Sequence, residues 1–259
     1  MFYKDLLRGI FIFLLSLPAH GQGGKPSARK NTAFHKEISH YALSAHTGLT
    51  QFYGELNSQH MRSMAGLALS RSLNRKLDLR LEYSFGKLGG EKREFFNSYF
   101  VNEYNTVELL AKWNLTEQFR GREKGDCDFS IYGGVGLMVF SSNAFDLDTD
   151  QLVRYTNSSL SARNPLFLRW GPPSGPMGIA KTREGILPVG MCLDYELMER
   201  WLLGLDFRFY WIRTDKADAT SGQRLINPEE AESYSDTPND KFSLLSVSIT
   251  HRLGKRPRR

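Results

Sequence analysis

The sequence lacks any long apolar run beyond its first 21 residues. A helix that spans a membrane needs about 20 consecutive, mainly apolar residues. Hydrophobic residues make up only 41% of the chain, which is a moderate share. If this chain enters a membrane, we therefore expect it to do so with strands.

Cysteine is scarce, and no group of cysteines and histidines has the spacing of a metal site. Cys127 and Cys192 fall on opposite faces of the strands predicted below, so no disulfide between them is expected. The glycine-rich run at residues 133–136 lies inside a predicted strand and lacks the Gly-Lys-Ser/Thr of a phosphate loop. The sequence therefore predicts no metal and no cofactor.

A concentrated patch of one charge sign is also missing. The chain has 34 basic and 28 acidic residues, a formal charge of +6, and the basic residues are scattered apart from the tail at residues 255–259. Nucleic-acid binding usually requires a basic stripe or cluster. No nucleic-acid partner is expected.

The amino terminus has the pattern of a secretory signal peptide. Lys4 and Arg8 are followed by an apolar core at residues 10–17 and by small residues before Gln22. We predict a signal peptide over residues 1–21, a short periplasmic segment over 22–40, a β-barrel over 41–254 and a basic tail over 255–259.

The most informative segment, residues 201–211, reads W-L-L-G-L-D-F-R-F-Y-W. In an extended chain, successive side chains point to opposite faces. One face then carries two Trp with Leu and Phe between them, and the other carries Asp206 and Arg208. An apolar face bounded by aromatics opposite a polar face is typical of a strand that separates lipid from a barrel lumen.

Seven other segments alternate in the same way: residues 41–54, 64–73, 77–86, 107–115, 129–140, 187–197 and 245–253. The gaps between the eight segments are mostly long after the odd-numbered ones (55–60, 88–102, 141–184 and 215–240) and mostly short after the even-numbered ones. This predicts an all-β fold, an eight-stranded antiparallel up-and-down transmembrane β-barrel with long external loops. A soluble lipocalin-like barrel, with its apolar face inward, is the alternative.

The polar faces of these segments predict a charged lumen. The expected lumenal residues are Asp78, Arg80, Glu82, Glu108, Lys112, Asp194, Glu196, Asp206, Arg208 and Arg252. The interior of an eight-stranded barrel is only wide enough for side chains, and buried charges persist when they are paired. We expect ion pairs that fill the barrel, with a narrow ion path as the alternative.

Two other groups of residues are candidates for function. Ser44 and His46 share the inward face of the first segment and, with a carboxylate, would resemble a catalytic set for ester hydrolysis, although filler roles are favoured. Aromatic residues are frequent in the predicted loops, and a binding patch for a partner or a glycan is the hypothesis that they suggest. The residues concerned are Phe95, Phe96, Tyr99, Phe100, Phe167 and Trp170.

The signal peptide, the eight alternating segments and the unequal gaps resemble the outer-membrane β-barrel domain family, whose members look like the OmpA barrel and include PorT-like proteins. The resemblance covers residues 41–254 and implies an integral outer-membrane location without catalytic residues. We expect a non-enzymatic protein with outer-membrane lipid around it and with envelope proteins or surface glycans as partners of its loops. The alternatives are a narrow pore, a transporter of small hydrophobic molecules, and a lipid A modifying enzyme.

Overall fold

The computed structural model describes residues 41–56, 58–74, 76–94, 96–119, 127–156, 177–178, 182–198, 200–219 and 239–253. The predicted signal peptide, the segment 22–40 and the basic tail lie outside these ranges. No helix within them is long and apolar enough to cross a membrane.

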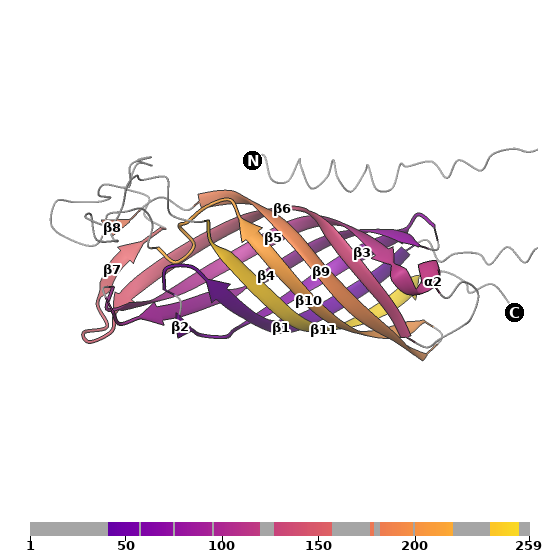
Figure 1. Ribbon diagram of the computed structural model, residues 1–259, viewed down its shortest axis with the longest axis horizontal. Coiled ribbons are helices and arrows are strands. Elements are labelled where there is room, and N and C mark those ends of the chain that lie inside the picture. Colours follow the sequence, from indigo (N-terminus) through magenta and orange to yellow (C-terminus); the bar gives the residue numbers. More distant parts are fainter. Residues whose placement is uncertain are drawn as a thin grey trace, which may run out of the picture. The chain divides into compact units, whose positions relative to one another are not determined.

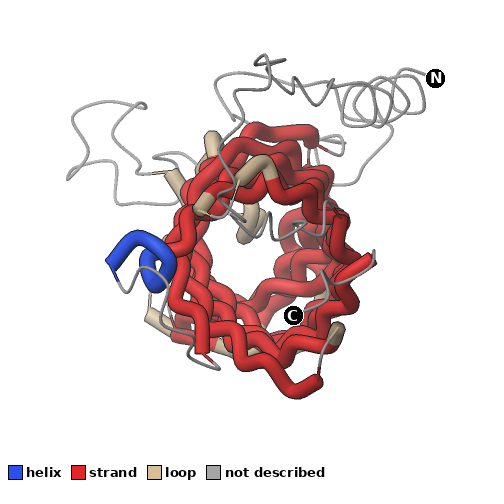
Figure 2. Tube along the Cα trace, turned by 90° about the vertical axis from the view of Figure 1, so that its right-hand side faces the viewer, coloured by secondary structure: helices blue, strands red, loops and turns tan. Residues whose placement is uncertain are grey.

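Eight long strands in the described ranges form a closed antiparallel ring (Figures 1 and 2). They are β1 (Tyr41–Tyr53), β3 (Arg62–Ser72), β4 (Leu77–Lys92), β5 (Ser98–Asn114), β6 (Cys127–Asp146), β9 (Thr182–Met198), β10 (Trp201–Ile212) and β11 (Lys241–Leu253). Each pairs with the next in this order, and β11 closes on β1 over the register Tyr41↔Leu253 to Tyr53↔Lys241. The predicted fold class is confirmed.

The two ends of the barrel differ. At one end, called the turn end here, short connections join β3 to β4 and β9 to β10, and α2 (Leu115–Phe119) lies between β5 and β6. The other end, the loop end, carries three short strands: β2 (Ser58–Gln59) on β4, β7 (Leu152–Tyr155) on β6, and β8 (Met177–Gly178) parallel to β7 (Figure 1). The predicted alternation of connections therefore holds at the turn end.

The exterior of the barrel carries the apolar faces that the sequence predicted. On β10, Leu203, Leu205 and Phe207 are 46–50% exposed, whereas Asp206 and Arg208 are buried inside. Similar outward apolar faces run along β1, β4, β5, β6, β9 and β11. A lipocalin-like barrel would show the reverse arrangement, so the soluble alternative is wrong for this part of the barrel.

The strands continue farther at the loop end than the sequence indicated. Residues 88–102 were expected to form a long loop, but β4 and β5 pair as far as Lys92↔Ser98 and leave only residues 93–97 between them. The expected loop at 141–184 likewise begins with strand, because β6 runs to Asp146. Our boundaries were wrong here because the strands leave the apolar belt, and charged residues such as Lys87 and Glu103 then stand on their outward face.

In these extensions the pattern of faces inverts. Lys87 and Glu103 form an exposed ion pair at 2.9 Å on the outside, whereas Leu88 and Phe100 are buried inside. An outward polar face and an inward apolar face are the arrangement of a barrel wall in water. We call this projecting part of the barrel the wall; it comprises residues 87–92 of β4, 98–103 of β5 and 141–146 of β6.

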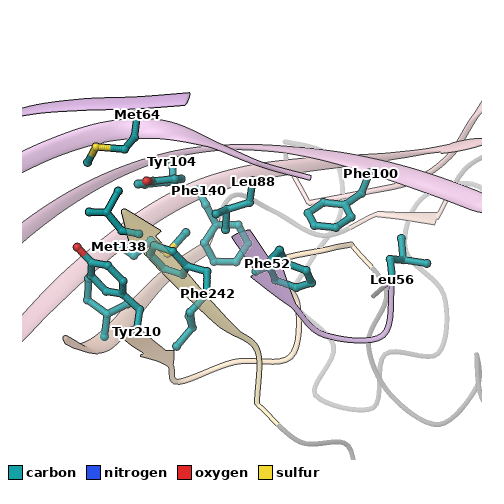
Figure 3. Close-up of a cluster of buried hydrophobic side chains, with 14 of the residues drawn as sticks. Phe52, Leu56, Met64, Leu88, Phe100, Tyr104, Met138, Phe140, Tyr210 and Phe242 are labelled. Carbon is teal, nitrogen blue, oxygen red and sulfur yellow. The ribbon is translucent and has the colours of Figure 1, made fainter. Parts of the chain in front are cut away.

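Inside the loop end, an apolar core fills the barrel (Figure 3). Tyr210 stacks on Phe242 with ring centroids 4.1 Å apart, and Phe52 meets Phe100 edge to face at 4.8 Å. The remaining core residues include Leu56, Met64, Leu88, Tyr104, Met138, Phe140, Ala144, Ile186, Ile212 and Leu244. Interdigitated aromatics of this size close the interior at this end.

The apolar belt and the wall respond differently to charge. Leu205→Arg places a guanidinium in the middle of the belt and is expected to cost about 2–4 kcal/mol of unfolding free energy in lipid vesicles. Val101→Arg, on the outer face of the wall, is expected to change it by no more than about 0.5 kcal/mol. Denaturant titration of both variants measures the difference, and equal costs would show that the wall also lies in lipid.

Candidate functional site

Arg208 lies at the centre of the charged interior. Its Nη1 donates to Glu82 Oε1 at 2.8 Å and to Glu108 Oε2 at 2.9 Å, and its Nη2 reaches Glu82 Oε2 at 3.2 Å. All three side chains are at most 1% exposed. Strand β10 therefore connects across the lumen to β4 and β5, which are not its neighbours in the ring.

The alternation of side chains along β4 and β5 explains why a guanidinium is needed in the lumen. Glu82 and Glu108 are register partners on adjacent strands, so two carboxylates lie side by side on the same inward face. Like charges directly opposite each other destabilise a sheet, and in a buried site they require a cation. Arg208, with its planar fork of donors, satisfies both at once.

Tyr132, Tyr210 and Arg80 complete the network around Arg208. Tyr132 donates to Asp206 Oδ1 at 2.5 Å and accepts from Arg208 Nε at 2.8 Å, while the Tyr210 hydroxyl lies 3.1 Å from Glu108 Oε1. Arg80 reaches Glu82 Oε2 at 2.7 Å. Tyr132 was not predicted as part of the network, because the glycines around it weaken the alternation of its strand.

The other predicted lumenal charges form separate pairs nearer the turn end. Lys112 contacts Asp194 at 2.5 Å, and Arg252 lies 3.6 Å from Glu196 with both side chains about one-third exposed. Asp78 is half-buried and lies opposite Lys112 in the β4–β5 register. The structure thus places nine of the ten predicted residues in ion pairs, grouped in layers along the barrel rather than in one continuous network.

The catalytic hypothesis for Ser44 and His46 has no support in the contacts of these residues. Ser44 Oγ bonds Thr250 Oγ1 at 2.7 Å, and His46 Nε2 instead meets Ser84 Oγ and Glu82 Oε1, each at 3.2 Å. In a serine-histidine-acid triad, the serine and the acid contact different ring nitrogens. Here one nitrogen faces both, and the set is buried inside the barrel. This geometry fits packing and charge pairing.

The aromatic residues expected in loops have different locations. Phe100 is fully buried in the apolar core, so its assignment to an exposed loop was wrong. Its side chain lies on the inward face of β5, opposite to that of its neighbour Tyr99. Phe96 packs against the same core. Among the described members of this group, Tyr99 lies on the outer face of the wall and is stacked on Phe145 with ring centroids 5.3 Å apart. Phe95, Phe167 and Trp170 lie outside the described residues.

Two neighbouring turns at the tip of the wall are bonded to each other. Asn97 Nδ2 donates to Asp148 Oδ2 at 2.7 Å, and the carbonyl of Asn97 accepts the N–H of Leu147 at 2.9 Å. Asn97 and Asp150 have positive φ angles of 41° and 55°, which Asn and Asp adopt more easily than most residues. We call this contact region the rim lock; it comprises Arg93, Asn97, Tyr99, Asp146, Asp148 and Asp150.

The sequence matches no family model and no curated protein. Several solved structures resemble the fold at low identity. Neisserial surface protein A is 11% identical, with 82% of this chain and 97% of that chain covered and a TM-score of 0.44. Ail of Yersinia pestis is 8% identical (81% and 97% covered, TM-score 0.42), and a major outer membrane protein of Thermus thermophilus is 13% identical (81% and 99%, TM-score 0.43).

What this chain is follows from its own geometry. A closed ring of eight strands leaves no unpaired edge, and its exterior is an apolar belt with charges inside. The chain is an integral β-barrel of the outer-membrane type. Cys127, exposed, and Cys192, buried, are both free in this barrel, as predicted from their opposite faces.

Removing the central cation tests how much the network contributes. Arg208→Ala leaves the Glu108 and Asp206 carboxylates buried without their cation, and Glu82 with only Arg80 and His46 beside it, and is expected to cost about 3–5 kcal/mol of unfolding free energy. Arg252→Ala breaks a partly exposed pair and is expected to cost at most about 1 kcal/mol. Equilibrium unfolding in detergent measures both, and similar costs for the two would contradict the central role of Arg208.

Proposed function

We propose that this protein is a non-enzymatic outer-membrane barrel that presents the wall and its rim lock to a partner at the surface. The observation that carries the proposal is the rim lock itself. A tip held by bonds between two turns is preorganised, so little conformational entropy is lost when a partner binds. Rigid scaffolds commonly carry recognition at such connections.

The outer face of the tip has the mixed chemistry of a recognition surface. The side chains of Arg93 and Asp148 are 73% and 61% exposed, and the Tyr99–Phe145 stack lies beside them. Tyrosine and arginine are enriched where proteins bind each other. A surface protein or a glycan of the envelope fits this combination of a flat aromatic stack and exposed charges.

The filled interior argues against the pore alternative. Along the barrel axis, the layers of Arg252–Glu196, Lys112–Asp194 and the Arg208 network lead into the aromatic core at the loop end. A permeant ion would have to break buried ion pairs and then displace packed Phe and Tyr side chains. Steady conduction through such an interior is unfavourable.

Planar-bilayer recording tests the closed lumen. The wild-type barrel is expected to show no stable conductance steps, because packed side chains fill its interior. A double variant that removes bulk from the aromatic core, Phe100→Ala with Phe242→Ala, should show steps or increased leak. Stable wild-type steps that this variant does not alter would contradict a closed lumen and favour the pore.

One observation favours the runner-up, a lateral path for small hydrophobic molecules. The β6–β9 pairing passes from Gly133↔Val189 to Gly136↔Ile186 without bridges between them, opposite Pro188, which has no N–H to donate. Outward Gly133 and Gly185 leave space on the exterior beside this interruption. If uptake of a hydrophobic probe into vesicles occurs and falls in Pro188→Val, the transport function replaces the one proposed above.

Site-specific photocrosslinking in the native membrane tests the recognition surface. A photoreactive phenylalanine at position 145 or in place of Asp148 is expected to give discrete adducts with a surface protein or glycan. The same residue at the lipid-facing position 205 is the control and should give none of these adducts. Adducts from position 145 should also decrease in Asn97→Ala, which removes bonds of the rim lock. Identical patterns at 145 and 205, or no adducts from the rim, would count against the proposal.

A further inference from the structure

Three carboxylates from separate connections meet at the loop end of the barrel. Glu55 follows β1, Asp218 follows β10, and Asp240 immediately precedes β11. One oxygen of each lies within 4.8 Å of the oxygens of the other two. The sequence did not reveal this cluster, because its members are 163 and 22 positions apart and lie outside the alternating segments.

The backbone around the cluster holds two of the carboxylates in place. Asp240 Oδ2 accepts the N–H of Ala217 at 2.7 Å, and Asp218 Oδ2 accepts the N–H of Leu56 at 3.3 Å. Asp218 and Asp240 are both fully buried. The positions of these oxygens are therefore set by the fold rather than by solvent.

Further buried oxygens without a hydrogen-bond partner among the described residues belong to residues that are bonded to the same backbone. Asn102, fully buried, donates from its Nδ2 to the carbonyl of Ala217 at 2.6 Å, and its Oδ1 is unbonded; Ala217 is also the residue whose N–H Asp240 accepts. Thr214, 4% exposed, accepts the N–H of Asp240 with its carbonyl, and its Oγ1 is unbonded. Asp240 Oδ1 is also unbonded. Buried oxygens without donors are rare, because each costs the free energy of its lost hydration.

Several acidic groups lie close together in the described part of the cluster. Glu55, Asp215, Asp218 and Asp240 oppose one another's ionisation, and the Arg154 guanidinium lies near Asp218. Burial, and then the nearby Asp218, raises the pKa of Glu55 to about 9. Burial, followed by Asp218 and Glu55, also raises the pKa of Asp240 well above its usual range. Burial lowers the pKa of Arg154, and Asp218 opposes that shift.

We propose that Glu55, Asp218 and Asp240 bind one divalent cation, Ca²⁺, with Asn102 Oδ1 and Thr214 Oγ1 as neutral oxygen donors. An all-oxygen set that mixes carboxylates, an amide and a hydroxyl is the coordination that Ca²⁺ prefers. Mg²⁺ retains several waters and demands octahedral geometry, which a buried cluster of fixed oxygens suits less well. The ion would connect the β1–β2 turn to both ends of the β10–β11 connection. This inference does not depend on the proposed recognition role.

Calorimetric titration of the full chain in detergent, after chelator treatment, tests the site with CaCl₂ and then MgCl₂. One saturable Ca²⁺ site is expected, with weaker binding of Mg²⁺. At a Ca²⁺ concentration of about 100 times Kd, the unfolding constant should fall about 100-fold. Glu55→Gln and Asp240→Asn are each expected to weaken binding at least tenfold. Glu103→Gln, the same change at an exposed glutamate on the wall, is the control and should bind as the wild type does.

Each outcome decides the proposal. Absence of saturable Ca²⁺ binding to the folded wild type overturns it, as does binding that both site variants retain. If Asp240→Asn is more stable than the wild type and the wild type shows no Ca²⁺ response, the carboxylates share protons and the site is not a metal site. If one variant does not fold, as judged by its heat-dependent electrophoretic mobility, the other variant and the wild-type titration still decide.

Discussion

The fold depends on one constraint, the burial of Glu82 and Glu108 side by side on adjacent strands. A closed eight-stranded ring has no room to hydrate two such carboxylates, so a cation must reach them from across the lumen. Arg208 does this with a planar group that contacts both acids and packs over Tyr132 and Tyr210. Because the guanidinium comes from β10, the same contact ties opposite sides of the ring and opposes any slip in strand register, since a shift of one residue would turn Arg208 toward lipid.

The barrel changes its solvent along its length, and its sequence changes with it. Within the apolar belt, the outward face is apolar and the lumen is charged; in the wall, the outward face includes charged residues and the interior is aromatic. The charged lumen of the belt depends on the aromatic core of the loop end. The charged layers remain compact only where water is excluded, and the aromatic core above them provides that exclusion at the loop end. Among the described residues, a filled interior then leaves the exterior tip of the wall as an accessible surface on that side.

These two zones also explain what the sequence could predict. Period-two alternation with apolar residues on one side, as in residues 201–211, located the belt strands, their faces and most lumenal charges. It failed at residues 88–102, where the alternation persists but its sense reverses: Leu88 and Phe100 point inward, and Lys87 and Glu103 outward. If the outward residues of every strand are expected to be apolar, such a stretch resembles a loop. The pairing of Arg208 with Glu82 and Glu108 was beyond prediction for another reason, because it depends on which strands face each other across the lumen.

The carboxylate cluster was beyond prediction for the same reason, because its members belong to separate connections that meet only in the folded barrel. Glu55, Asp218 and Asp240 lie just above the aromatic core, where the connections of β1, β10 and β11 converge. The Arg208 network satisfies its acids with a cation from the chain itself, whereas the acids of this cluster oppose one another's ionisation. In the lumen an internal cation is unavoidable, because no ion can enter a packed interior. At the loop end, the proposed Ca²⁺ would take the place of such an internal cation and would link the connections of β1, β10 and β11 to one another.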